Sequence, residues 1–145
     1  MIIYVAKGGR DYKEKLKSLI KNKKFLEKKE VLGIIENFEK TVYYSGLNGI
    51  KMKIHGTRMG FSFISLQIAL YVLNKYNDYE SAMRYIISLG GDTDTNCAIA
   101  GSLLGAKLGY KKIPKKWLEA IFGSKYNRPE EFKINQRLLN KLFKI

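Results

Sequence analysis

This sequence of 145 residues lacks most of the features that mark secreted or membrane proteins. Its single cysteine, Cys97, excludes an internal disulfide framework and fits a reducing compartment. It has no apolar run of about 18 residues, so no transmembrane helix is expected. The apolar residues 1–6 are too few for the core of a signal peptide, and the first positive charges follow them. These absences predict a cytoplasmic protein with no membrane partner.

Acidic residues are also scarce, because 13 Asp and Glu stand against 27 Lys and Arg, giving a formal net charge of +14. Such an excess is typical of proteins that attract nucleic acid or phosphate-bearing ligands. The lysines are spread along most of the chain, however, and many read as solvated helix faces. Zinc-finger spacing, Arg-Gly tracts and an RNP-like aromatic motif are missing. We therefore do not expect a nucleic-acid partner, and rank nucleic-acid binding below the enzymatic and the non-catalytic binding functions considered below.

Strand patterns are few, and helical spacing of apolar residues covers most of the chain. We expect helices over residues 11–22, 25–44, 61–77, 78–89, 96–109, 114–122 and 134–143. Residues 1–6 fit either a short strand or a helix that ends at a glycine. Gly101 and Gly105 lie four residues apart, which lets a neighbouring helix approach closely. With no repeat and no linker, the sequence predicts one compact all-α domain over residues 1–145.

The most informative stretch is SLGGDTDTNC, residues 88–97, which places two carboxylates and two hydroxyls in a glycine-led turn. Asp92 and Asp94 are two residues apart and can point to the same side, and Thr95 adds a neutral oxygen. Oxygen ligands of this kind suit Mg²⁺ or Mn²⁺. The alternative is helix capping, in which Asp94 or Thr95 accepts the first N–H groups of the next helix. The residues alone leave these two interpretations equally balanced.

The stretch GGDTDTNCAIAGSLLGAKLGYKKIPKKW, residues 90–117, resembles the C-terminal signature of the ADP-ribosylglycohydrolase family. The shared pattern is the double glycine, D-T-D-T, a small-residue helix and IP..W beyond it. Residues 60–73 resemble the family's Gly-aromatic segment with its following helix, and residues 2–20 resemble a helix, its glycine stop and the next helix. The resemblance covers most of this chain, but only the C-terminal half or so of the family's fold.

This resemblance implies an all-α domain with two Mg²⁺ (or Mn²⁺) ions, in which Asp92, Asp94 and Thr95 are metal ligands. It also implies that Phe61 and Gly91 lie at the bound substrate. The implied activity is metal-dependent hydrolysis that releases ADP-ribose from modified protein side chains, so the expected partners are ADP-ribosylated protein or ADP-ribose. The alternative is a catalytically inactive member that binds ADP-ribose or a related nucleotide, or serves as a scaffold.

One element of the family's pattern has no counterpart here. The family's remaining metal ligands lie in an early Thr-Asp-Asp element, and this sequence contains no Asp-Asp pair. The resemblance therefore implies that the chain lacks the family's N-terminal half and supplies at most part of the metal site. We expect that half to come from a partner chain or from another copy in a homo-oligomer. No catalytic residue is assigned, and the lone histidine, His55, receives no role.

Overall fold

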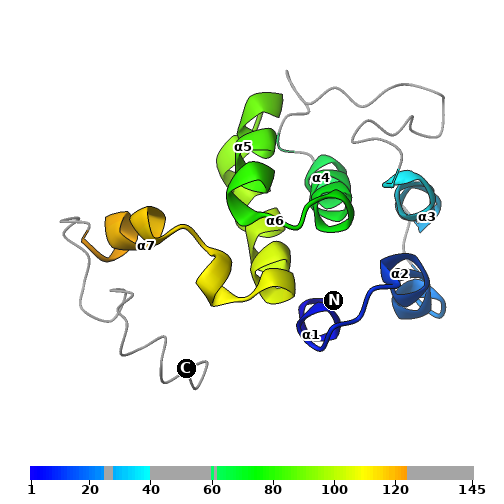
Figure 1. Ribbon diagram of the computed structural model, residues 1–145. Coiled ribbons are helices and arrows are strands. Elements are labelled where there is room, and N and C mark those ends of the chain that lie inside the picture. The colour runs from blue at the N-terminus through cyan, green and yellow to red at the C-terminus, as the bar shows by residue number, and fades with distance from the viewer. Residues whose placement is uncertain (25–27, 40–59, 61, 124–145) are drawn as a thin grey trace, which may run out of the picture. The chain divides into compact units, whose positions relative to one another are not determined.

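The computed structural model describes residues 1–24, 28–39, 60 and 62–123, and Figure 1 shows their arrangement. These residues form seven α-helices and one short 3-10 helix, with no strand among them. This confirms the predicted all-α class. The elements are α1 (Ile2–Ala6), α2 (Tyr12–Ile20), α3 (Lys28–Asn37), α4 (Ser62–Lys75), α5 (Tyr79–Leu89), α6 (Thr93–Leu108), the 3-10 helix η1 (Tyr110–Lys112) and α7 (Lys115–Phe122).

Contacts divide the chain into two compact units, residues 1–112 and 113–145. The first unit holds α1 to α6 and η1. In the second unit, α7 begins after Pro114, as expected for a residue that fits the start of a helix but not its interior. The predicted helix over 134–143 lies outside the described residues. The single-domain prediction stays a prediction.

Helix α4 is central to the first unit because it is buried on most of its surface. It packs against α6 on one side and α3 on another, while α6 also contacts α5 and α1 (Figure 1). The branched aliphatic side chains that are almost completely buried come from α3 to α6: Ile34, Ile35, Ile64, Ile68, Leu70, Val72, Leu73, Ile86 and Leu104. Burying each aliphatic side chain of this size contributes roughly 1.5–3 kcal/mol, so this core is the main source of stability.

Local capping chemistry sets several helix ends. Asp11 caps α2 by accepting from the backbone N–H of Glu14 at 3.1 Å, and Asp78 caps α5 by accepting from Ser81 at 2.7 Å. Both caps confirm the predicted starts. Residues 2–6 are helical rather than extended, and Gly8, at φ +81°, donates to the carbonyl of Val5 just past the helix end. This is the left-handed glycine stop of a helix.

The glycines of α6 make room for a side chain of α5. A Cβ built at Gly101 would lie 2.7 Å from the hydroxyl of Tyr79, and one built at Gly105 would lie 3.8 Å from Cε2 of the same ring. The predicted close approach is therefore confirmed, and the group that approaches is the Tyr79 ring. Burial raises the pKa of Tyr79, so its hydroxyl stays protonated at neutral pH.

Helix α6 is also tied to the far end of α4. The Lys107 side chain donates from Nζ to the carbonyls of Leu73 and Tyr76, both at 2.8 Å. These carbonyls lie at the C-terminal end of α4, where no helical partner remains for them and a cation is favoured. Burial, with Arg10 nearby, lowers the pKa of Lys107. The lysine thus closes the end of a helix that is not its own.

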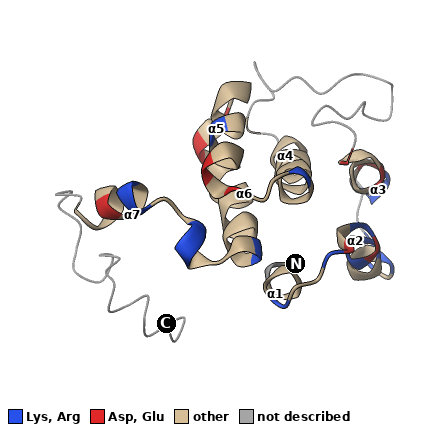
Figure 2. Ribbon diagram, viewed as in Figure 1, with Lys and Arg blue, Asp and Glu red and all other residues tan. Residues whose placement is uncertain are grey.

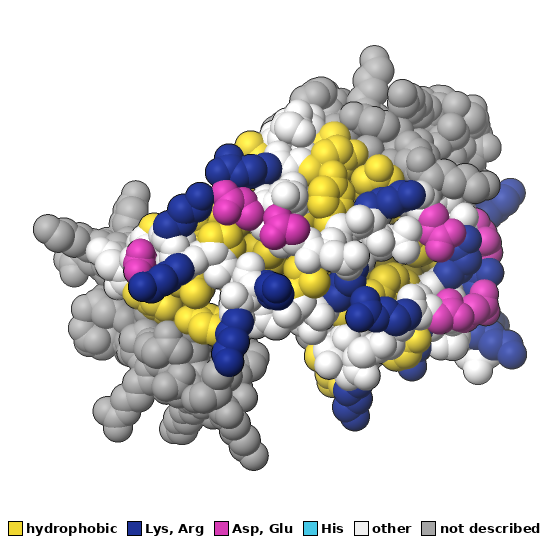
Figure 3. Space-filling view, viewed as in Figure 1, with side chains coloured by type: hydrophobic (Ala, Val, Ile, Leu, Met, Phe, Trp, Pro, Cys, Tyr) yellow, Lys and Arg dark blue, Asp and Glu magenta, His cyan; other side chains and the backbone are white. Residues whose placement is uncertain are grey.

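Charged side chains are distributed over the described surface. Figure 2 shows Lys and Arg on most of the helices drawn, and Asp or Glu on several of the same helices. On the face seen in Figure 3, Lys and Arg are interspersed with acidic and hydrophobic side chains. Several lysines of α2 are paired, for example Lys17 with Glu36 at 2.6 Å. Among the described helices, none combines the length and apolar character needed to cross a membrane.

Candidate metal centre

The acidic turn joins α5 to α6. Gly90 and Gly91 follow α5 with φ of +71° and +73°, a left-handed conformation that side chains other than glycine adopt at a cost. The chain thereby reverses within two residues, and α6 starts at Thr93. The predicted start at residue 96 was wrong by three residues. Asp and Thr are common both before a helix and in its first turn, so their identity alone does not locate the boundary.

Asp92 occupies the N-cap position, but its side chain makes no capping hydrogen bond. Its backbone carbonyl accepts from the N–H of Asn96 at 3.0 Å and so closes the first turn of α6. Capping falls instead to Asp94, whose carboxylate accepts from backbone N–H groups of the first turn. The backbone contacts of Asp94 agree with a role at the helix start, whereas the Asp92 side chain makes no capping bond to the backbone.

The two carboxylates lie close enough to interact directly. A hydrogen bond from the Asp92 carboxyl, followed by those from the N–H groups of Thr95 and of Asp94 itself, lowers the pKa of Asp94. Two ionised carboxylates in contact repel each other, and a bound cation would offset that repulsion. Asp94 and Thr95 are exposed and Asp92 is half-buried, so the oxygens are within reach of an ion.

The donor set fits a hard divalent cation. It offers two carboxylates and one hydroxyl, all of them oxygen ligands, and within the described residues no Lys or Arg forms an ion pair with Asp92 or Asp94. A dication held between the two carboxylates would relieve the repulsion between them. In the part of the chain that the structure describes, no three His, Cys, Asp or Glu side chains gather in a group that could hold a metal. The described residues thus offer one side of a site.

A second segment approaches this turn. A Cβ built at Gly60 would lie 3.5 Å from Oδ2 of Asp92, which is ordinary van der Waals contact. Gly60 comes two residues before α4, so the Gly-aromatic segment noted in the sequence reaches the acidic turn. Phe61, the predicted substrate-binding residue next to it, lies outside the described residues. Gly91, the other, is half-buried within the turn itself.

Two residues next to this turn were missed by sequence reasoning. Ser65 of α4 and Asn96 of α6 are both buried, and the Ser65 hydroxyl donates to Oδ1 of Asn96 at 2.7 Å. Asn96 directly follows Thr95, so it lies at the base of the acidic turn. The only signal in the sequence was a serine within the apolar run of residues 61–73, which by itself is compatible with helix packing.

Cys97, the next residue, is a half-buried free thiol. Burial raises its pKa, and the negative charge of Asp94 acts in the same direction. Its sulfur lies 4.0 Å from the carbonyl of Met83, to which the thiol donates weakly. A raised pKa keeps the group as a thiol at neutral pH, so Cys97 is poorly suited to act as a nucleophile.

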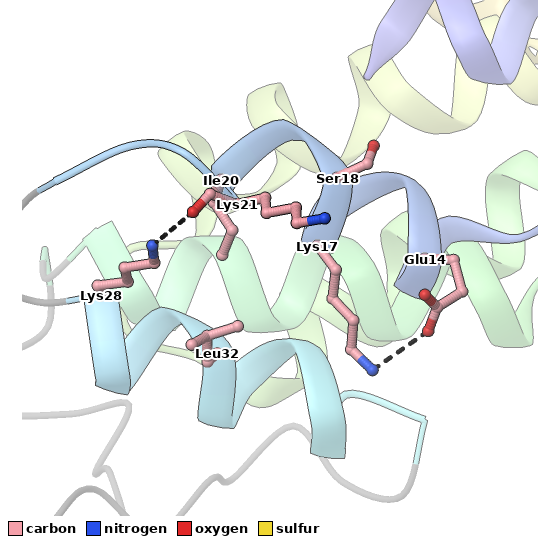
Figure 4. A pocket seen from close by; sticks show the side chains of 7 residues that line it. All are labelled: Glu14, Lys17, Ser18, Ile20, Lys21, Lys28 and Leu32. Carbon is pink, nitrogen blue, oxygen red and sulfur yellow. Dashed lines mark hydrogen bonds and ion pairs between the residues drawn. The ribbon is translucent and has the colours of Figure 1, made fainter.

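A cleft elsewhere in the first unit offers no competing site. It has a volume of ≈ 440 Å³ and is lined by residues of α2, α3 and the turn after α2 (Figure 4). Two of its three lysines are already engaged. Lys17 pairs with Glu14 at 3.2 Å, and Lys28 donates to the carbonyls of Lys21 and Lys23. These contacts neutralise or occupy the groups that would bind an anion.

Similarity to known proteins indicates the family of this chain. The family model for ADP-ribosylglycohydrolase matches residues 1–143. A mimivirus protein, L543 of Acanthamoeba polyphaga mimivirus, bears a provisional ADP-ribosyl glycohydrolase name and is 42% identical over 69 residues, which is 48% of this chain and 21% of that protein. The human ADP-ribosylhydrolase ARH3 is 40% identical over 48 residues, 33% of this chain and 13% of its own length.

A bacterial relative, the ADP-ribosylarginine hydrolase Tri1 of Serratia proteamaculans, is 31% identical over 62 residues, which cover 43% of this chain and 17% of Tri1. The matched stretches thus span about a fifth or less of these three relatives. No solved structure matches the chain. Because the family model extends over nearly the whole sequence, the chain belongs to the ADP-ribosylglycohydrolase family.

Proposed function

We propose that this chain provides one side of a Mg²⁺ or Mn²⁺ centre in a hydrolase that removes ADP-ribose from modified protein side chains. The observation that carries the proposal is the pair of interacting carboxylates, Asp92 and Asp94, with Thr95 exposed beside them at the start of α6. Family membership supports the choice of substrate, since relatives carry the names ADP-ribosylhydrolase and ADP-ribosylarginine hydrolase. The lone cysteine fits the cytoplasm, where we place the protein.

In this proposal Asp92, Asp94 and Thr95 hold the ions through their side-chain oxygens. The bound metal supplies polarisation of the ribose hydroxyls and activation of water. Water adds its oxygen to the anomeric carbon, the bond from that carbon to the protein side chain breaks, and the departing side chain takes a proton. In this proposal Gly91 lies in the turn at the substrate, as the family resemblance implies.

A second candidate function follows from the partial ligand set. The described residues supply two carboxylates and a hydroxyl, whereas a binuclear centre requires further oxygens from another element. If no partner segment or second copy provides them, the chain binds ADP-ribose or a related nucleotide without cleaving it, or acts as a scaffold. We therefore expect hydrolysis only when the N-terminal half of the family's fold is also present.

The test has two measurements on the full chain. Mn²⁺ binding, followed by electron paramagnetic resonance and by thermal unfolding, should raise the unfolding free energy by about 2.7 kcal/mol at 100 times the dissociation constant. ADP-ribose release from arginine- and serine-modified peptides is then measured with Mg²⁺, with and without an N-terminal segment from a family member.

Asp92→Asn should abolish both signals, and Glu119→Gln, which removes one carboxylate charge in α7, should leave them unchanged. Binding without turnover in either arm would favour the nucleotide binder. Absence of Mn²⁺ binding by the wild-type chain would refute the metal centre.

A further inference from the structure

The strongest unexplained feature near the acidic turn is a polar pair inside the core. Ser65 is 3% exposed and Asn96 is 0% exposed, among the few polar side chains buried to this degree in the described part of the chain. They join the first half of α4 to the first turn of α6 through one hydrogen bond of 2.7 Å. The amide nitrogen Nδ2 of Asn96 has no hydrogen-bond partner among the described residues.

This pair is a poor way to stabilise a core. A buried amide nitrogen without a partner costs its full desolvation, and replacing both members of such a pair by apolar groups is often neutral or stabilising. The other buried residues of α4 and α6 are mostly apolar, including Ile64, Ile68 and Ala100. Because the pair adds little to the free energy of unfolding, we look for a role other than stability.

The position of the Ser65–Asn96 pair in the chain indicates this other role. The backbone N–H of Asn96 donates to the carbonyl of Asp92 at 3.0 Å, so the residue held by Ser65 also closes the turn that carries the acidic side chains. A Cβ built at Gly60, two residues before α4, would lie 3.5 Å from Oδ2 of Asp92. Ser65 in α4 therefore holds the base of the turn, and the backbone just before α4 lies near its carboxylate.

We propose that Ser65 and Asn96 are positioning residues that fix the acidic turn for metal binding, an inference that rests on the proposed function. The hydrogen bond sets the position of Asn96 along α4, and through the Asn96 N–H it sets the carbonyl and side chain of Asp92. Residues that hold ligands in place commonly change metal affinity 10–100-fold when they are removed. The pair therefore acts on affinity through geometry and makes no contact with the ion.

The experiment compares Mn²⁺ affinity with fold stability in the full chain. The variants are Ser65→Ala and the double change Ser65→Ala with Asn96→Leu, which leaves no buried polar atom at the site. Ser102→Ala is the matched control. Ser102 lies on α6, the helix of Asn96, is exposed, and donates to the carbonyl of Ile99 in that helix. Hydrogen exchange of residues 92–97 in the metal-free proteins reports whether the first turn of α6 is loosened.

We expect the double variant to unfold at or above the wild-type temperature, to exchange faster at residues 92–97, and to bind Mn²⁺ about 10-fold more weakly. Ser102→Ala should match the wild type in all three. If the folded double variant binds Mn²⁺ with wild-type affinity, the positioning role is wrong and the metal centre is unaffected. Should the double variant not fold, the same result in folded Ser65→Ala, or in a further variant Ser65→Cys, would overturn the role. If the wild type itself does not bind Mn²⁺, the proposed function fails and this inference fails with it.

Discussion

The contact between Tyr79 and the glycines of α6 yields a prediction in which two similar substitutions have opposite effects. Alanine in place of glycine inside a helix stabilises by about 1 kcal/mol when the added methyl group has room. At Gly105 the nearest atom would be 3.8 Å away, which is an ordinary contact. Gly105→Ala should therefore raise the unfolding free energy by up to about 1 kcal/mol, or the melting temperature by roughly 3 °C.

At Gly101 the same methyl group would meet the Tyr79 hydroxyl at 2.7 Å, well inside a normal contact of about 3.5 Å. Overpacking of this kind costs about 1–3 kcal/mol, which exceeds the gain in helix propensity. Gly101→Ala should therefore lower the unfolding free energy by about 1 kcal/mol. The two glycine variants should differ by about 2 kcal/mol in urea or thermal unfolding.

A double-mutant cycle identifies the cause. Removing the hydroxyl with Tyr79→Phe leaves the ring atom Cζ at 3.7 Å from the new methyl group, so Gly101→Ala should be tolerated in that background. The expected coupling energy is about 2 kcal/mol, within the range for residues in contact. If Gly101→Ala stabilises the chain as much as Gly105→Ala does, or if the cycle is additive, Tyr79 does not pack against α6 as described.

Three further predictions concern charged residues. Asp94→Asn should weaken Mn²⁺ binding at least about 10-fold in a titration followed by electron paramagnetic resonance, because it removes one of two anionic ligands; unchanged affinity would exclude Asp94 as a ligand. Lys107→Met should destabilise the chain more than Lys75→Met in urea unfolding, since Lys107 binds two carbonyls at the end of α4 and Lys75 is exposed there; equal effects would contradict this. Hydrogen bonds from the Ser81 N–H and hydroxyl lower the pKa of Asp78. The stabilisation by this ionised cap is therefore complete above the ordinary carboxyl pKa and is lost as the pH falls through the lowered value. Asp78→Asn should flatten this acid dependence of the unfolding free energy, and an unchanged pH profile would refute the prediction.

The parts of the fold that could be predicted from sequence depend on local chemistry. The caps Asp11 and Asp78 can be recognised in the sequence because each carboxylate accepts from the backbone N–H three residues later, an interaction within one short segment. Residues 1–6 could not be assigned, because so short a segment has no clear period and its helix packs against α6, far along the chain. The start of α6 at Thr93 was missed because Asp and Thr fit both sides of a helix boundary.

The candidate site divides in the same way. Asp92, Asp94 and Thr95 form a continuous motif that residue chemistry alone could suggest as oxygen ligands. Ser65 and Gly60 lie about 30 residues away in sequence, so their contacts with the turn depend on how α4 meets α6. No local pattern contains that information. The family model's match to residues 1–143 confirms family membership, while the assignment of these ligands from the GGDTDT signature stays a prediction.

The composition of α6 explains why such a distant contact would be needed. Several of its buried or half-buried residues are small, among them Gly101, Ala100 and Ala106, and small side chains offer few interlocking contacts that would fix the sliding of one helix along another. A single buried polar pair can fix the register of two helices at some cost in stability, as a buried asparagine does in coiled coils. In this chain that pair lies at the end of α6 which carries Asp92. A substitution there should therefore separate the two properties, leaving the melting temperature nearly constant while the affinity for a dication falls.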